Sequence, residues 1–255
     1  MAFWLCGILA IMPQSQNATK PTKTMSRRNK LQKFAEVRTF HNVYQNFDTK
    51  EAQPLLLGAT GKVNLNGQWQ SVHFGNENPI TLELACGRGE YTLDLARRYP
   101  NRNFIGVDVK GARIWKGAKI ALEEGLSNTV FLRTRIELIN PFFAANEIDE
   151  IWITFPDPFL KERKIRRRLT APNFLDRYRL LLKQGGLLHL KTDDPTLYEF
   201  TIETLEADPK ATILYHKDDI YSEPLLFEEL TTKTYYEKMH LEKGRKIKYV
   251  RFRIN

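Results

Sequence analysis

The sequence predicts one doubly wound α/β domain, in which helices cover both faces of a mostly parallel sheet, preceded by a basic extension. Three observations lead to this prediction. From residue 80 onward, short apolar segments typical of strands alternate with segments whose apolar residues have helical spacing. A glycine turn at residues 87–89 follows the first of these strands. At 255 residues and 42% hydrophobic composition, the chain is long enough for one large domain with a buried core.

The predicted elements follow one another in a regular order. Strand-like segments lie at 80–86, 103–109, 128–134, 148–155, 185–192, 211–217 and 247–254. Segments with helical spacing lie at 90–99, 112–125, 135–144, 171–183 and 195–207, and Gly125 is placed to end the second helix. Residues 26–50 are expected to form a basic, partly helical arm, and residues 51–79 a loop with short extended pieces. We therefore expect a basic extension at 26–79 and the main domain at 80–255.

The first residues of the chain do not resemble a standard targeting segment. Residues 1–12 are apolar, but no basic region precedes them, no clean cleavage site follows them, and the run is too short to span a bilayer. The stretch that begins at Met25 looks like a plausible protein start. We expect residues 1–25 to be a disordered tail or to precede the true start, and we expect no association with a membrane.

Cysteine and histidine usage argues against two kinds of site. The only cysteines are Cys6 and Cys86, which are far apart in the sequence, so no disulfide framework or thiolate metal site is predicted. The five histidines have no spacing typical of metal ligands. These patterns favour a reducing, cytoplasmic compartment and a protein without a bound metal.

The net charge of +9 is concentrated in three segments. Residues 20–33, 161–168 and 243–253 each contain six Lys or Arg, with one acidic residue among all three segments. Elsewhere acidic residues outnumber basic ones. Each run taken alone is equally well explained as a solvated surface, but three runs of one sign favour a polyanionic partner such as a nucleic acid.

The glycine turn indicates a site for a nucleotide. Glycines at 87 and 89 allow backbone to approach a ligand closely, and the dinucleotide-binding fingerprint would require a third glycine where Thr92 stands. The spacing fits better the E-x-G-x-G-x-G pattern of S-adenosylmethionine (SAM) methyltransferases, which Glu83 opens. Asp108, at the end of the next strand, is placed to accept hydrogen bonds from ribose hydroxyls, although it is also explained as an ordinary acid at a strand end.

The segment "FPDPFLKERKIRRRL" follows the fourth strand, where ligands bind in open α/β sheets. Pro156 and Pro158 restrict the backbone on both sides of Asp157 and so limit where its carboxylate can point. This arrangement predicts an acid fixed beside the nucleotide. The alternative is a rigid turn in which Asp157 caps the next segment.

This segment resembles the FPDPW-x-K-x-x-x-x-K-R-R signature of the bacterial tRNA (guanine-N7)-methyltransferases of the TrmB type. Residues 80–255 are also similar to that family in "LELACGRGEYT", "FIGVDVKGAR", "HLKTDD" and "TKTYYE". The resemblance implies the seven-stranded class I SAM methyltransferase fold. It also implies transfer of a methyl group from SAM to N7 of the guanine at position 46, in the tRNA variable loop, which leaves S-adenosylhomocysteine.

The resemblance assigns roles to particular residues. Asp157 would be the catalytic residue, and the cofactor pocket would be lined by Glu83, Gly87, Gly89, Asp108, Thr134 and Asp157 itself. The tRNA would contact Lys161, Asp193, Thr234, Tyr235, Tyr236 and Glu237. The charge of the basic run, independently of the resemblance, predicts contacts to the tRNA phosphates by Arg163, Lys164, Arg166, Arg167 and Arg168. The sequence departs from the family at three positions. Ala85 replaces a glycine, Phe159 replaces a tryptophan, and Thr134 replaces an Asp or Asn at the position of the adenine contact.

Some of these residues are equally well explained by local structure. Asp193 and Asp194 are placed to cap the helix that follows, and Thr234 with Glu237 matches a capping box. The chain could also methylate another RNA or another base atom, or bind RNA without catalysis. Because guanine N7 carries a lone pair and no proton, Asp157 is not expected to be a general base. A monomer and a homodimer are equally compatible with the sequence.

Overall fold

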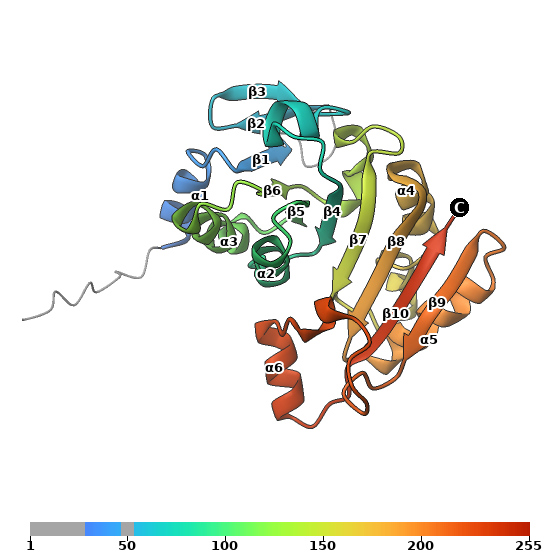
Figure 1. Cartoon of the computed structure of the whole chain (residues 1–255). Coiled ribbons are helices and arrows are strands. Elements are labelled where there is room, and N and C mark those ends of the chain that lie inside the picture. Colours follow the sequence, from blue (N-terminus) through green and yellow to red (C-terminus); the bar gives the residue numbers. More distant parts are fainter. Residues whose placement is uncertain (1–28, 47–53) are drawn as a thin grey trace, which may run out of the picture.

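The computed structural model describes residues 29–46 and 54–255. The expectations about a tail at 1–25 and a start at Met25 lie outside the described residues. Within them, a twisted sheet runs through the whole molecule, with helices on both faces (Figure 1). The predicted α/β class with a mostly parallel sheet is confirmed.

The seven predicted strands are all present. They are β4 (Ile80–Leu84), β5 (Asn103–Asp108), β6 (Thr129–Arg133), β7 (Ile148–Thr154), β8 (Leu182–Thr192), β9 (Ala211–Lys217) and β10 (Lys248–Ile254). Their order across the sheet is β6-β5-β4-β7-β8-β10-β9. Neighbours from β6 to β8 are parallel, and β10 is antiparallel to both β8 and β9. The order therefore reverses between β4 and β7.

The sheet has ten strands in the described residues, so the predicted number of seven was too small. Three short strands continue the sheet beyond β6: β1 (Val43–Asn46), β2 (Leu55–Gly58) and β3 (Gly61–Asn64). Strand β1 pairs in parallel with β6, where Val43 lies opposite Phe131. Strands of four residues leave little periodicity to detect in a sequence, and pairing with β1 removes an exposed edge at β6.

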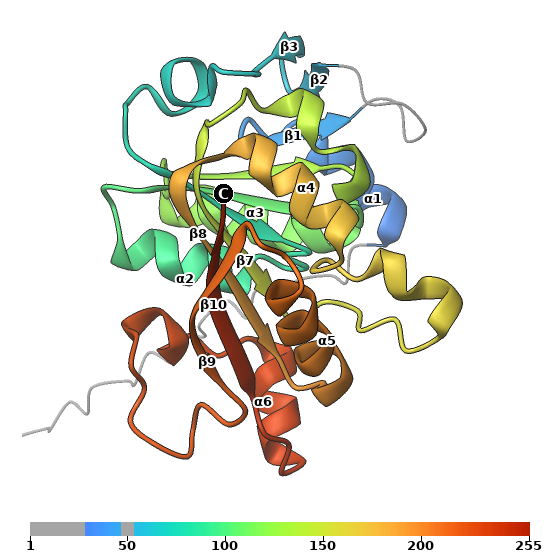
Figure 2. The ribbon, with the colours of Figure 1, turned by 90° about the vertical axis from the view of Figure 1, so that its right-hand side faces the viewer.

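Helices cover the sheet on both sides. Helix α1 (Lys30–Val37) packs on α3 (Gly111–Glu124), beside α2 (Glu90–Arg98), on one face (Figure 1). Helices α4 (Pro172–Leu181) and α5 (Pro195–Glu206) cover the other face (Figure 2). Helix α6 (Tyr235–Glu242) lies beyond the ends of the central strands. The predicted helix at 135–144 was wrong: two short 3₁₀ turns stand there, because Pro141 cannot continue an α-helix.

The core is divided by the sheet. In β4, the alternating residues Ile80, Leu82 and Leu84 are fully buried in the cluster that includes α4 and α5. The intervening Glu83 therefore points to the face that α2 covers. This packing fixes the carboxyl ends of β4, β5 and β7 at one edge of the sheet, beside the point where the strand order reverses.

Candidate active site

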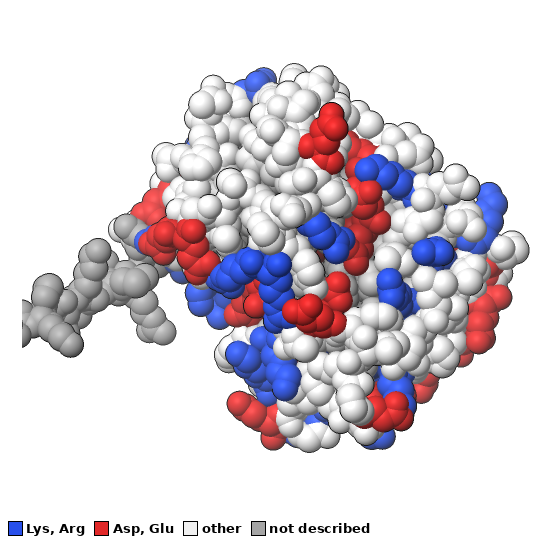
Figure 3. Space-filling model, in the orientation of Figure 1, with Lys and Arg blue, Asp and Glu red and all other residues white. Residues whose placement is uncertain are grey.

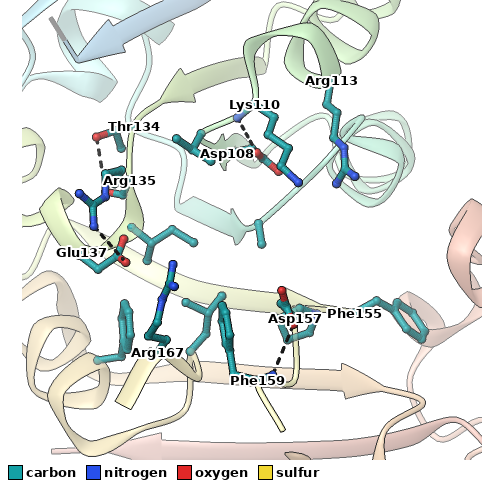
Figure 4. Close-up of a pocket in the computed structure, with 16 residues that line it drawn as sticks. Asp108, Lys110, Arg113, Thr134, Arg135, Glu137, Phe155, Asp157, Phe159 and Arg167 are labelled. Carbon is teal, nitrogen blue, oxygen red and sulfur yellow. Dashed lines mark hydrogen bonds and ion pairs between the residues drawn. The ribbon is translucent and has the colours of Figure 1, made fainter. Parts of the chain in front are cut away.

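A cavity of about 430 Å³ lies at this edge of the sheet. Two groups of side chains face each other across it (Figure 4). Asp108, Arg113 and Thr134 come from the ends of β5 and β6 and from α3, whereas Asp157 and Arg167 come from the segment after β7. The structure thus brings together candidate residues from both of the motifs that the sequence singled out.

The glycine turn takes a left-handed backbone. Gly89 has φ 68° and packs tightly, since a Cβ added there would lie 2.5 Å from the Phe131 ring. Gly87 has φ 59° and borders a smaller neighbouring cavity. Ala85, which stands where the methyltransferase pattern has a glycine, also has a positive φ of 60°. A left-handed residue with a Cβ costs roughly 1–2 kcal/mol, so the surrounding packing must hold this turn in place.

Asp108 ties the end of β5 to the glycine turn. Its Oδ1 accepts a hydrogen bond from the Lys110 backbone N–H at 2.7 Å, and its Oδ2 accepts one from the Gly87 N–H at 2.9 Å. A carboxylate has about four acceptor positions, so each oxygen can accept a further hydrogen bond. Asp108 also lines the cavity. Its free acceptor positions could therefore take hydrogen bonds from two neighbouring hydroxyl groups of a ligand, such as those of a ribose.

Glu83 is buried beneath the turn. Its Oε1 accepts a hydrogen bond from the Thr154 hydroxyl at 2.7 Å, and its Oε2 accepts from the Thr92 backbone N–H at 2.9 Å and from the Thr92 hydroxyl. Burial raises its pKa to about 7, although these hydrogen bonds act in the opposite direction. Glu83 borders a cavity of about 60 Å³ that Thr234, Tyr235 and Tyr236 also line.

Thr134 is buried at the end of β6 and lines the main cavity. Its hydroxyl accepts a hydrogen bond from the Asn46 side chain at 3.4 Å, and its backbone N–H donates to the Asp108 carbonyl at 3.2 Å. The adenine contact implied for Thr134 stays a prediction, now placed on a residue that borders the same cavity as Asp108.

Asp157 differs from these buried groups because it is exposed. Its only hydrogen bond in the described structure is a long one, 3.4 Å from the Phe159 N–H to Oδ1. The flanking residues Phe155 and Phe159 have positive φ values of 48° and 43°. The carboxylate therefore stands free in the cavity, on a backbone in an unfavourable conformation.

Arg168 holds this backbone, and it is poorly placed for the expected phosphate contact. It is buried, its Nε donates to the Pro158 carbonyl at 2.9 Å, and its guanidinium lies 4.5 Å from the Phe200 ring centroid. A guanidinium enclosed in this way has little surface left for a phosphate. Arg168 is better described as the residue that fixes the loop carrying Asp157.

The other basic residues of the run are more accessible. Arg167 lies 4.9 Å from the Phe159 ring centroid and extends into the cavity (Figure 4). Lys161, Arg163 and Arg166 are exposed and Lys164 is half-buried. This segment lies beside α4 (Figure 2), where Arg166 also borders a groove between α4 and α5. RNA contacts by these residues stay predictions.

The late candidate residues are engaged within the protein. Thr234 caps α6 by accepting from the Glu237 N–H at 3.2 Å, which is one half of the expected capping box; the Glu237 carboxylate contacts Lys191 and Tyr221. Glu237 is fully buried against Lys191. Asp194 caps α5, and Asp193 pairs with Arg245 at 2.6 Å. Only Tyr235 and Tyr236 of this group are exposed.

Arg113 is a site residue that no sequence motif assigned. It lies in the first turn of α3 and lines both cavities, and its Nη2 donates to the Tyr236 hydroxyl at 3.3 Å. The side chain thereby joins α3 to α6 above the site. The only signal in the sequence was its place just after Asp108 in "VDVKGAR".

The charge on the surface is mixed. In the view of Figure 3, basic side chains gather around α2 and α6 with acidic ones between them. Arg97, Arg98, Lys233 and Lys238 border a polar groove in that region. No group of three or more His, Cys, Asp or Glu within residues 29–46 and 54–255 could hold a metal ion. In the same ranges, no helix has the length and apolar composition needed to cross a membrane.

The known proteins that this chain resembles are methyltransferases. A family model described as "putative methyltransferase" matches residues 77–250. The tRNA (guanine-N(7)-)-methyltransferase of Christiangramia forsetii is 48% identical over 232 residues, which cover 90% of this chain and 100% of that protein. The protein of the same name from Bacteroides thetaiotaomicron is 43% identical over 227 residues, covering 89% of this chain and 86% of the relative.

Solved structures show the same fold at low sequence identity. The 16S rRNA methyltransferase KamB superimposes with a TM-score of 0.55 at 14% identity, covering 74% of this chain and 93% of that chain. A structure described as an antibiotic-related methyltransferase gives a TM-score of 0.52 at 19% identity, covering 71% of this chain and 90% of that chain.

Proposed function

The chain belongs to the tRNA (guanine-N7)-methyltransferase family, and we propose how its site carries out that reaction. The protein transfers a methyl group from SAM to N7 of a guanine in tRNA. We assign the target to the variable loop, at position 46, and the place of action to the cytoplasm, with a monomer or a homodimer as the working form. The observation that carries the proposal is the free carboxylate of Asp157 in the cavity, opposite Asp108.

The cofactor side of the cavity is suited to an adenosine. Asp108 has acceptor positions left for two ribose hydroxyls, and Thr134 borders the space where the base would lie. When bound, SAM supplies a methyl group on a positively charged sulfur. The glycine turn, Glu83 and Tyr236 border the adjoining small cavity, which we assign to the amino-acid end of the cofactor.

Asp157 is assigned to the guanine. Its carboxylate can accept hydrogen bonds from the N1–H and N2–H₂ donors of the base, which fixes the orientation of N7. When the N7–carbon bond forms, the carbon–sulfur bond of SAM would break and neutral S-adenosylhomocysteine would leave. The positive charge would then lie on the guanine ring, where a nearby carboxylate would stabilise it. No proton leaves N7, so Asp157 does not act as a base.

The target base must leave its stacked position to reach the cavity. Arg167 and the exposed basic residues near it are placed to hold the neighbouring phosphates while the base enters. This explains why an acid that contacts the base is followed at once by a basic segment in the sequence.

One experiment tests the proposed reaction. Unmodified tRNA is incubated with labelled SAM, and the product is digested and its nucleosides are mapped. We expect 7-methylguanosine at position 46, and no label in a transcript whose variable-loop guanine is replaced by adenine. Label on another base, or at another guanine, would contradict the assignment.

A further inference from the structure

We propose that Glu237 and Asp193 are positioning residues that hold α6 over the active site, and that the exposed pair Tyr235 and Tyr236 is the part of this segment that meets the RNA. The inference rests on the proposed function. The family resemblance implies that both acidic residues contact the substrate. The inference instead assigns Glu237 to a buried ion pair and Asp193 to a partly exposed one.

Glu237 forms a fully buried ion pair with Lys191 of β8. The Nζ–Oε1 distance is 2.8 Å, and both side chains have 0% of their surface exposed. The Lys191 ammonium also donates to the carbonyls of Leu230 and Thr232, both at 3.0 Å, so all three of its donors are used. The Tyr221 hydroxyl donates to the same Glu237 oxygen at 2.7 Å. A carboxylate enclosed in this way has no route to an RNA molecule.

Asp193 makes a second connection between β8 and α6. It lies just beyond the end of β8, and its Oδ2 is 2.6 Å from Nη1 of Arg245 and 3.2 Å from Nδ1 of His240. His240 belongs to the last turn of α6, and Arg245 follows that helix. The start and the end of the helix are therefore both tied to the end of one strand.

These polar contacts matter because α6 has little apolar anchorage. The helix has eight residues, and the only one that is fully buried is Glu237. Leu241 is partly buried against the core. Isolated helices of this length are unstable in water, so the ion pairs determine where α6 lies.

The anchored helix presents two aromatic rings at the entrance to the site. Tyr235 and Tyr236 are 55% and 43% exposed and line the cavity beside the glycine turn. The guanidinium of Arg88 lies 5.6 Å from the Tyr235 ring centroid, and Arg113 donates to the Tyr236 hydroxyl. Exposed aromatic rings flanked by arginines are suited to stacking on unpaired bases.

A double substitution tests whether Glu237 anchors α6 or contacts the RNA directly. Glu237→Leu alone leaves the Lys191 charge buried without its partner, and we expect the melting temperature to fall by roughly 10 °C, with a higher KM for tRNA. Adding Lys191→Met removes the uncompensated charge, and buried pairs replaced by apolar residues commonly regain stability. The double variant is expected to regain most of the melting temperature and the wild-type Kd for tRNA.

The comparison variant is Tyr235→Ala with Tyr236→Ala. We expect it to melt near the wild type but to bind tRNA roughly tenfold more weakly, because the two rings would no longer stack on bases of the RNA. A double variant at 191 and 237 that recovers its melting temperature but still binds tRNA poorly would overturn the inference, as would one that melts as low as Glu237→Leu. If the wild type methylates no tRNA, the proposed function fails, whereas the melting data and tRNA binding still test the anchoring.

Discussion

The two sides of the cavity are built in opposite ways. On the β4–β5 side, Glu83 and Asp108 are buried, and backbone N–H groups already donate to both carboxylates. On the β7 side, Asp157 is exposed, and its only hydrogen bond in the described structure is long. In the proposed function, the side assigned to the cofactor is organised without a bound ligand, whereas the carboxylate on the side assigned to the RNA is free to contact the tRNA.

Removing Asp108 should have the largest effect on cofactor binding, because we assign the ribose contact to this residue. Asp108→Ala loses the acceptor for two backbone N–H groups and for the ribose, which amounts to about 3 kcal/mol, or roughly 100-fold in affinity. Calorimetric titration with S-adenosylhomocysteine measures this. Asp218→Ala is the control, since that side chain is 66% exposed and its ion pair with Lys246 is long, at 3.9 Å. Equal affinity in both variants would mean that Asp108 does not hold the cofactor.

On the RNA side of the cavity, the buried residue Arg168 holds the loop that carries Asp157. Arg168→Met keeps the bulk but loses the hydrogen bond to the Pro158 carbonyl, so the loop of Asp157 is less well fixed. We expect kcat to fall roughly tenfold while the KM for tRNA changes little, since a charge-assisted hydrogen bond contributes about 1.5–3 kcal/mol. Arg166→Met, on an exposed side chain, is the comparison variant: it should raise the KM for tRNA and leave kcat unchanged. A change confined to KM would instead indicate a phosphate contact by Arg168.

The exposed basic residues should contribute binding that depends on salt. Replacing Arg163 and Arg166 with Met should make the salt dependence of tRNA binding less steep. The plot of the log of the association constant against log salt concentration should flatten by about 1 for each phosphate that the protein no longer neutralises, with kcat unchanged. Filter binding of tRNA at several salt concentrations measures the slope. An unchanged slope would show that this run does not face the RNA.

The buried acid Glu83 should affect the pH dependence of stability rather than catalysis. Its pKa of about 7 in the folded protein lies above the ordinary value of 4.5, so the folded state holds a proton that the unfolded state releases. The contribution of Glu83 to stability should therefore fall as pH rises from about 4.5 to about 7, by at most about 1.4 kcal/mol per pH unit. Glu83→Gln does not titrate, so urea unfolding should show a weaker fall. Parallel curves for the two proteins would contradict the raised pKa.

The sequence predicted the features that depend on neighbouring residues and missed those that depend on contacts between distant segments. The strand segments, the glycine turn and Asp108 follow from local patterns, because each depends on residues that are close in sequence. The short strands β2 and β3 lie within 51–79, where short extended pieces were expected, but β1 was missed because it pairs with β6, far along the chain. The roles of Arg168, Glu237 and Lys191 were equally hidden, since a charged residue looks the same in a sequence whether it is buried with a partner or exposed to solvent.

The central claim is that Asp157 orients the guanine and stabilises its developing charge. Asp157→Asn keeps the shape of the side chain and removes its charge, so we expect methylation of tRNA to fall at least about 100-fold. The Kd values for tRNA and for S-adenosylhomocysteine should stay near those of the wild type. Single-turnover methylation, measured together with both Kd values, is the most direct test. Near-normal methylation by Asp157→Asn would contradict the claim.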